Sequence, residues 1–166
     1  MKKGFTLIEL LVVIAILGIL SSIVLSSLTR ARSSASLART KLEFKTLVTA
    51  IEMYTQDHGG VMPADVNRGL PPGLEAYVSG GNWPNAPWPG SVYDWDNWDD
   101  PDNPGQKIYQ ISVRFCPAGQ PSQCQFPNES WAINFDYYSA FYYCIQGACR
   151  SHDSQPINHP GHCSNC

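Results

Sequence analysis

The stretch Met1-Lys2-Lys3-Gly4-Phe5-Thr6-Leu7-Ile8-Glu9 leads into an apolar run that ends near Leu28. From Phe5 to Leu28 the sequence contains one charged residue, Glu9, and no proline. At about 1.5 Å per residue, a helix over 5–28 would be about 36 Å long, enough to cross the hydrocarbon core of a bilayer. Leu, Ile and Val occupy every side of this helix, as a membrane span or a fully buried helix requires.

Two common export signals, a cleaved signal peptide and a signal anchor, each leave a feature of this run unexplained. A secretory signal peptide has an apolar region of about 7–15 residues before its cleavage site, and this run is longer, although its paired serines imitate such a site. An ordinary signal anchor leaves Glu9 without a role. A charged side chain within a membrane helix is costly, which makes Glu9 a candidate functional residue.

The string Gly4-Phe5-Thr6-Leu7-Ile8-Glu9 closely resembles the processing motif of type IV pilins and type II secretion pseudopilins. The resemblance implies that residues 1–4 are a leader, that prepilin peptidase cuts after Gly4, and that Phe5 becomes an N-methylated N-terminus. Glu9 matches the glutamate that this family needs for methylation or assembly. A physical reason supports that role, because cleavage frees an ammonium at Phe5 that becomes buried. A carboxylate one helical turn away, on the same or a neighbouring subunit, neutralises it.

The residues after the apolar run predict that the helix continues to His58. Over 29–58, apolar side chains recur every three or four residues among polar and charged ones, which is the pattern of a helix with one buried face. Gly59-Gly60 then suits a helix C-terminus. We therefore expect one helix over 5–58, with 5–28 in the membrane or the filament core and 29–58 carrying a globular head over 59–166.

The head is expected to contain a small sheet. The segment Tyr54–Pro63 resembles the helix-exit signature of the major pseudopilins, with one residue more between glycine and proline than their usual form, and the resemblance implies an αβ-loop over 63–82. Alternating apolar and polar residues predict strands at Lys107–Cys116, Trp131–Tyr137 and Ser139–Ile145, with a short fourth strand after Ala148. The expected fold is α+β, the pilin fold, in which the long N-terminal helix packs against a small antiparallel sheet.

An acidic stretch rich in tryptophan and proline, 83–106, precedes the first predicted strand. Its prolines disfavour long regular elements, so we expect a loop. Its aspartates repel one another unless they are solvated or bind a cation, and Ca²⁺ takes carboxylate, amide and carbonyl oxygens from flexible loops. The candidate calcium ligands are Asp94, Asp96, Asp99, Asp100 and Asp102. The full EF-hand pattern is absent, and the alternative is a solvated acidic loop whose tryptophans pack on the sheet.

Six cysteines, all in the head, predict disulfides in an exported, loop-rich domain. They are Cys116, Cys124, Cys144, Cys149, Cys163 and Cys166. Local geometry favours a bond from Cys144 to Cys149 across a hairpin turn. Cys116 and Cys124 bracket a turn-rich loop, which leaves the last two cysteines to each other or to the earlier pairs by exchange. Histidines near the last two cysteines also provide zinc-ligand types, and a disulfide competes for the same sulfurs.

Composition and motifs favour a structural protein over an enzyme or a nucleic-acid-binding protein. The net charge is −3, whereas phosphate contacts need basic patches. The sequence lacks the nucleophile-elbow, Walker, zinc-protease and dinucleotide-binding motifs. The resemblance implies a subunit that moves from the inner membrane through an assembly machinery into a homopolymeric filament, which serves adhesion, motility or DNA uptake outside the cell. A periplasmic pseudopilin of a secretion system is the alternative, and a membrane-anchored binding module that never polymerises is a second one.

Overall fold

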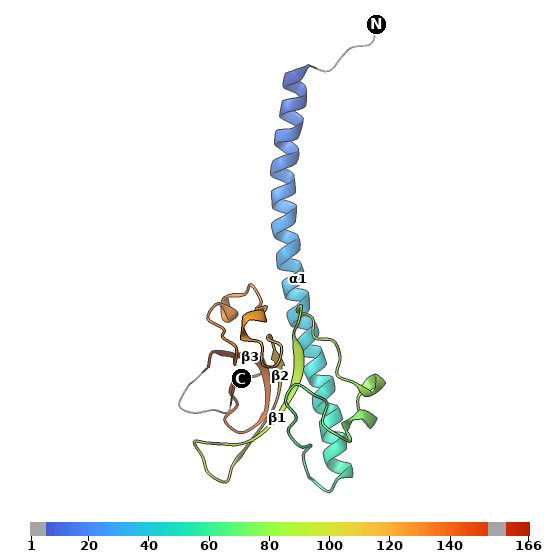
Figure 1. Cartoon of the computed structure of the whole chain (residues 1–166). Helices are drawn as coiled ribbons and strands as arrows, with labels where there is room; N and C mark the ends of the chain where they lie inside the picture. Colours follow the sequence, from blue (N-terminus) through green and yellow to red (C-terminus); the bar gives the residue numbers. More distant parts are fainter. Residues whose placement is uncertain (1–5, 153–158) are drawn as a thin grey trace. The chain divides into compact units, whose positions relative to one another are not determined.

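The computed structural model describes residues 6–152 and 159–166 of the chain. The chain divides into two compact units, Met1–Ala35 and Ser36–Cys166. A single long helix, α1 (Leu7–Asp57), supplies the first unit and continues as part of the second. The second unit adds a sheet of four strands and several short turns of 3-10 helix (Figure 1). The predicted α+β class, with one long N-terminal helix and a small sheet, is confirmed.

Helix α1 has clear signals at both ends. Thr6 precedes its first turn, and the side chains of Thr6 and Glu9 bond to each other's backbone N–H groups, which is the arrangement of a capping box. No proline interrupts the helix. Gly59 and Gly60 follow its last residues with φ of 66° and 90°. The N–H of Gly60 donates to the carbonyl of Thr55 at 2.8 Å, so the helix ends in a turn that glycine adopts without strain because it has no Cβ.

The sheet consists of β1 (Val92–Asp99), β2 (Lys107–Arg114), β3 (Ala140–Gln146) and β4 (Gly161–Cys163), in that spatial order. β1 pairs with β2, and β2 pairs with β3, in antiparallel fashion. β4 pairs with β3 in parallel. The strands predicted at Lys107–Cys116 and Ser139–Ile145 correspond to β2 and β3.

The prediction that the acidic stretch 83–106 is a loop throughout is wrong, because it contains β1. Its prolines lie before and after the strand rather than within it, so they frame the strand and leave its hydrogen bonds intact. Tyr93 and Trp95 point to one face of the sheet and are fully buried, while Asp94 and Asp96 point to the other. The residues thus alternate between two faces as in a strand. In the sequence the pattern is hard to recognise, because aspartates are uncommon on a buried face.

The strand predicted at Trp131–Tyr137 is wrong. Trp131–Tyr137 begins within the 3-10 turn η4 (Ser130–Ala132) and continues as turns. Trp131 and Phe135 contact each other with ring centroids 5.5 Å apart, whereas Ile133 between them is 81% exposed, so the apolar spacing reflects a turn that buries two large rings. Residues 149–152 run along the polar face of the sheet without forming a strand. A short fourth strand does follow Ala148, but it begins only at Gly161 and pairs with β3 in parallel.

The core of the second unit lies between α1 and one face of the sheet (Figure 1). Its members from α1 and the three longer strands include Phe44, Leu47, Ile51, Tyr93, Trp95, Ile111, Val113 and Phe141. Burying each such side chain contributes about 1.5–3 kcal/mol. Between β1 and α1, the αβ-loop carries η1 (Leu74–Ala76) and η2 (Ser79–Gly81), and Leu74 is buried in the same core. The opposite face of the sheet is polar.

Candidate functional site

The N-terminal end of α1 is the first candidate site. Gly4 and Phe5, the predicted cleavage residue and new N-terminus, lie outside the described residues. Glu9 is described, and its carboxylate Oε2 accepts hydrogen bonds from the backbone N–H of Thr6 at 2.8 Å and from the Thr6 hydroxyl at 2.7 Å. The Thr6–Glu9 spacing is a capping-box signature, so this second role of Glu9 is also visible in the sequence. In the single chain Glu9 therefore caps its own helix.

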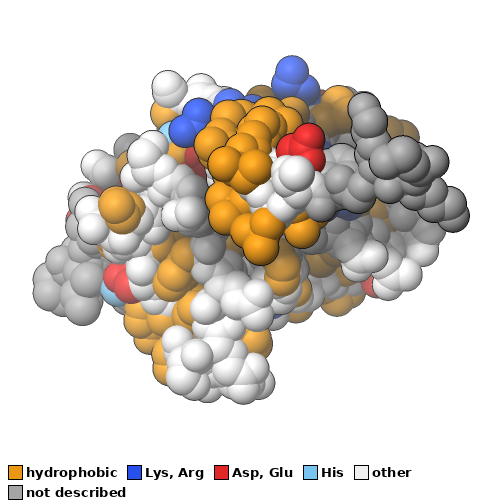
Figure 2. Space-filling model, turned by 90° about the horizontal axis from the view of Figure 1, so that it is seen from above, with side chains coloured by type: hydrophobic (Ala, Val, Ile, Leu, Met, Phe, Trp, Pro, Cys, Tyr) orange, Lys and Arg blue, Asp and Glu red, His pale blue; other side chains and the backbone are white. Residues whose placement is uncertain are grey.

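The first half of α1 exposes apolar side chains around its whole circumference. Leu7 is 80% exposed, and Leu25, about five turns later, is 66% exposed. The segment has the length and hydropathy of a membrane-spanning helix. Figure 2, viewed from the N-terminal end, shows hydrophobic side chains surrounding the end of the helix. An apolar surface of this extent is stable only when lipid or other protein covers it, because water disfavours it.

The polar face of the sheet contains a buried group of three charged residues, Asp94, Asp96 and Arg114. The guanidinium of Arg114 donates through Nε to Asp94 at 3.1 Å and through Nη2 to Asp96 at 3.2 Å. Its Nη1 donates to the carbonyls of Tyr138 and Ser151. All three charged side chains are buried. The structure thus forms an aspartate–arginine–aspartate triad in the interior, where charges are stable only when paired.

The triad carries two carboxylates for one guanidinium, and this imbalance affects Asp96. Burial raises the pKa of Asp96 to about 7, and the neighbouring Asp94 acts in the same direction, although Arg114 favours the charged form. Gln110 also donates to Asp96 at 2.9 Å. The pKa of Arg114 is raised, since the two carboxylates outweigh the effect of its burial. The head therefore contains a buried carboxylate, that of Asp96, whose charge changes near neutral pH.

The remaining candidate calcium ligands pair with other cations. Asp99 is exposed and forms an ion pair with Lys107 at 2.8 Å. Asp100 and Asp102 bond to the guanidinium of Arg150 at 3.0 and 2.6 Å. The five aspartates therefore divide into three groups, each with its own basic partner. Within residues 6–152 and 159–166, no group of three or more His, Cys, Asp or Glu side chains is placed to hold a metal ion.

Three disulfides constrain the head, and each is local in the sequence. They join Cys116 to Cys124, Cys144 to Cys149, and Cys163 to Cys166. The bond from Cys144 to Cys149 that local geometry favours is present, and Cys116 closes its loop with Cys124. For the last two cysteines the structure has the pairing with each other. The disulfide from Cys163 to Cys166 uses both sulfurs that the sequence offers as possible zinc ligands.

Several residues that shape the polar face are not recognisable as such from the sequence. Gln110 bonds to Asp96 and, through its amide, to the backbone N–H and carbonyl of Arg150. These contacts hold the chain after β3 against the sheet. The signal was present, because Gln110 and Arg114 lie on the polar side of an alternating strand. That pattern predicts a face but does not say whether the face is buried.

Comparisons with known proteins agree with the N-terminal motif. A family model described as the prokaryotic N-terminal methylation motif matches residues 1–25. Type II secretion system core protein G of Klebsiella michiganensis is 30% identical over 99 residues, which cover 54% of this chain and 70% of that protein. Prepilin peptidase-dependent protein D of Escherichia coli K12 is 39% identical over 80 residues, 47% of this chain and 55% of that protein. Fimbrial protein EcpB of Eikenella corrodens is 42% identical over 67 residues, 40% of this chain and 42% of that protein.

No solved structure gives a significant match to the chain. The relatives include both a secretion-system protein and a fimbrial protein, so the similarity supports the family as a whole rather than one branch of it. The methylation motif, the apolar helix and the small sheet packed against its second half agree with that family. The chain belongs to the family of type IV pilins and type II secretion pseudopilins.

Proposed function

We propose that this chain is the structural subunit of a type IV pilus. The observation that carries the proposal is the apolar surface of α1 from Leu7 to Leu28, which is exposed on all sides in the single chain. In a filament the same segments of neighbouring subunits would cover one another, and burial of this area would drive polymerisation. The similarity to a fimbrial protein supports the pilus branch.

In this proposal the N-terminal residues act in turn in membrane insertion, cleavage and assembly. Before assembly the apolar segment holds the subunit in the inner membrane. Prepilin peptidase removes residues 1–4 after Gly4, and Phe5 becomes the N-methylated end. Glu9 then neutralises the new ammonium as the assembly machinery of the inner membrane transfers the subunit into an extracellular homopolymer. The filament would serve adhesion, motility or DNA uptake.

A major-type pseudopilin of a type II secretion system is the second candidate. The 30% identity with core protein G, over 70% of that protein, favours it. In that case the polymer would remain in the periplasm and act in protein export. A membrane-anchored binding module that never polymerises is the third candidate, in which lipid alone would cover the apolar segment.

Electron microscopy and intact mass measurement of sheared surface material separate these candidates. The pilus proposal expects extracellular filaments whose subunit begins at Phe5 and carries one added methyl group. Deletion of the gene should remove the filaments and leave protein secretion intact. Loss of secretion with no change in surface filaments would favour the pseudopilin. A subunit that still begins at Met1 and never forms a polymer would favour the membrane-anchored module.

A calcium site in the acidic stretch is a narrower proposal. The carboxylate of Asp100 accepts hydrogen bonds from the backbone N–H of Asp102 and the side-chain amide of Asn103, which makes an oxygen-rich turn. Arg150 occupies the position beside these carboxylates that a cation would take. Calcium would therefore compete with this guanidinium.

Calorimetric titration of the full chain with CaCl₂ in nonionic detergent tests the calcium proposal. Binding predicts a saturable heat and a higher melting temperature, because a ligand that binds only the folded state stabilises it. The substitution Arg150→Ala should tighten binding by removing the competing cation, and MgCl₂ serves as the control. If neither the original chain nor the variant gives heat or stabilisation, the carboxylates have a structural role only.

A further inference from the structure

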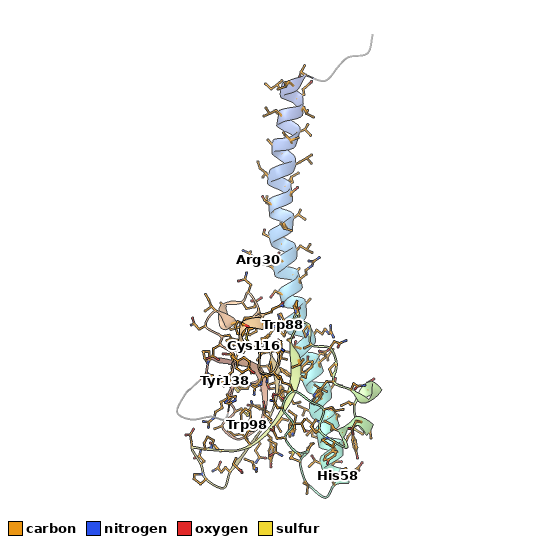
Figure 3. All side chains as sticks on the ribbon, in the orientation of Figure 1. Arg30, His58, Trp88, Trp98, Cys116 and Tyr138 are labelled. Carbon is orange, nitrogen blue, oxygen red and sulfur yellow. A yellow bond between two sulfur atoms is a disulfide. The ribbon has the colours of Figure 1, made fainter. Side chains whose placement is uncertain are left out.

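A cleft of about 330 Å³ lies on the polar face of the sheet, on the side opposite the core. The triad of Asp94, Asp96 and Arg114 lines it, and because these side chains are buried we call the triad its floor. The remaining lining consists of Asp65, Asn67 and Arg68 of the αβ-loop and of aromatic residues. Figure 3 labels two of the aromatic residues, Trp98 and Tyr138. The filament function proposed above makes no use of this cleft.

The floor of the cleft is a fixed set of hydrogen-bonding groups. Asp94 is held by Arg114 and by the backbone N–H of Arg68, which donates to it at 2.6 Å. Asp96 is held by Arg114 and Gln110. A carboxylate oxygen has two acceptor sites, so each aspartate retains capacity for a donor from outside. Because buried partners lock these side chains, the groups are already positioned for a ligand.

The walls of the cleft add aromatic surface and further polar groups. Tyr138 is 40% exposed, and its ring centroid lies 4.4 Å from that of His152 and 5.0 Å from that of Tyr137. The guanidinium of Arg68 lies over the Tyr137 ring at 5.5 Å. Asn67 accepts from Arg68 at 3.0 Å. The cleft therefore combines hydrogen-bond donors, acceptors and flat apolar rings within a small space.

We propose that this cleft binds a carbohydrate of one or two sugar rings. A sugar ring has hydroxyl groups that both donate and accept hydrogen bonds, and it has an apolar C–H face that packs on an aromatic ring. The aspartates would accept from hydroxyls, Arg68 and Asn67 would donate to them, and Tyr138 with Trp98 would pack against the ring. The volume falls in the range of small-ligand sites, about 300–1,000 Å³.

The charges of the lining favour a neutral ligand over a metal ion or an organic cation. Three carboxylates, of Asp65, Asp94 and Asp96, face two guanidinium groups, of Arg68 and Arg114. The arginines largely compensate the acidic charge, and both would repel a cation that enters the cleft. A strongly acidic cage, which a free cation needs, is therefore absent from this lining.

Saturation-transfer NMR on the full chain tests the proposal. The protein is kept in a polyoxyethylene detergent, because maltoside detergents carry a sugar that would compete. The probes are the methyl glycosides of glucose, galactose, mannose, N-acetylglucosamine and N-acetylgalactosamine, with ethylammonium chloride as the cationic alternative. We expect at least one glycoside to give a saturable signal. Signals from ethylammonium alone, or from no probe, would overturn the proposal.

Lining variants show whether binding occurs in the cleft. Tyr138→Ala removes an exposed ring but retains the backbone carbonyl that Arg114 uses, and it should weaken binding about tenfold. Asn67→Ala is a second exposed variant that keeps the core intact. Ile133→Ala, at an exposed residue that does not line the cleft, should leave binding unchanged. Equal affinity in all of these variants would show that the sugar binds elsewhere and would overturn the proposal. The measurement uses unassembled protein, so its outcome does not depend on filament formation.

Discussion

Asp96 links the stability of the head to pH. Burial raises its pKa to about 7 in the folded chain, against an ordinary value of 3.8. Between these values the folded chain holds a proton that the unfolded chain has released. The contribution of Asp96 to the free energy of unfolding is therefore full below about pH 4 and is lost as the pH rises to about 7.

We expect the variant Asp96→Asn to lose this part of the pH dependence. Comparison with the original chain is needed because His162, whose pKa burial lowers, gives the opposite trend below its ordinary value of 6.5. Melting temperatures measured from pH 4 to pH 8 in the same detergent provide the test. Asp99→Asn, at an exposed ion pair, is the matched control and should keep the original slope. An unchanged slope in Asp96→Asn would assign the titration to another group.

Glu9 has two separable roles at the residue scale, a helix cap and a negative charge. Glu9→Gln retains an oxygen that can accept from Thr6 but removes the charge, whereas Glu9→Ala removes both. If the carboxylate neutralises the Phe5 ammonium, both variants should insert into the membrane and yield far fewer filaments. Thr6→Val, which removes a hydroxyl of the cap, should cost about 1 kcal/mol locally and leave assembly intact.

Filament yield by electron microscopy and membrane insertion by fractionation measure these effects. Normal filaments from Glu9→Gln, together with loss of filaments in Glu9→Ala, would mean that the cap alone matters. The charge-neutralisation account of Glu9 would then be wrong.

Helix α1 changes its environment along its length, and this is the main feature at the scale of elements. Its first half exposes apolar residues on every side, whereas its second half buries one face against the sheet. The buried side chains of that face are Thr40, Phe44, Leu47, Ala50 and Ile51. Their spacing of three and four residues is the amphipathic pattern that the sequence predicts for 29–58.

The variant Phe44→Ala tests how much this face contributes. Phe44 is fully buried and contacts the rings of Tyr93 and Phe141, at centroid distances of 5.9 and 5.4 Å. Its loss should lower the free energy of unfolding by about 3–5 kcal/mol through the cavity that it leaves. Leu42→Ala, two residues away and 66% exposed, should change it by less than about 0.5 kcal/mol. Chemical denaturation measures both, and equal effects would contradict this helix–sheet packing.

At the scale of the whole molecule, the chain combines a unit that cannot remain exposed to water with one that has its own core. Among the described residues, the buried ones begin at Thr40, inside the second unit. We therefore expect a chain that begins at Ser36 to fold without the apolar segment and to be soluble without detergent. The three local disulfides, all in this unit, should add to its stability.

Size-exclusion chromatography and thermal melting by circular dichroism test this expectation. The shortened chain should elute as a monomer and melt cooperatively, while the full chain should require detergent. Aggregation of the shortened chain, or a melt without a cooperative transition, would mean that the head depends on residues before Ser36.

The amino-acid sequence by itself determined the long helix, its two environments and the α+β class. These features rest on local signals: an uninterrupted apolar run, a three-to-four-residue apolar spacing, and a glycine pair at the helix end. Two of the strands also followed from alternation of apolar residues. Local geometry favoured the disulfide from Cys144 to Cys149, whereas the partners of the last two cysteines stayed open until the structure paired them with each other.

Only the tertiary structure decided the fate of the acidic stretch. Asp94 and Asp96 could be solvated, bound to a metal or buried, and their own sequence neighbourhood does not distinguish these outcomes. Arg114 lies on the adjacent strand and Arg150 lies beyond β3, so the ion pairs form only when the strands pair and the chain crosses the polar face. Burial of charge depends on distant partners that compensate its loss of hydration, and such partners become neighbours only through the fold.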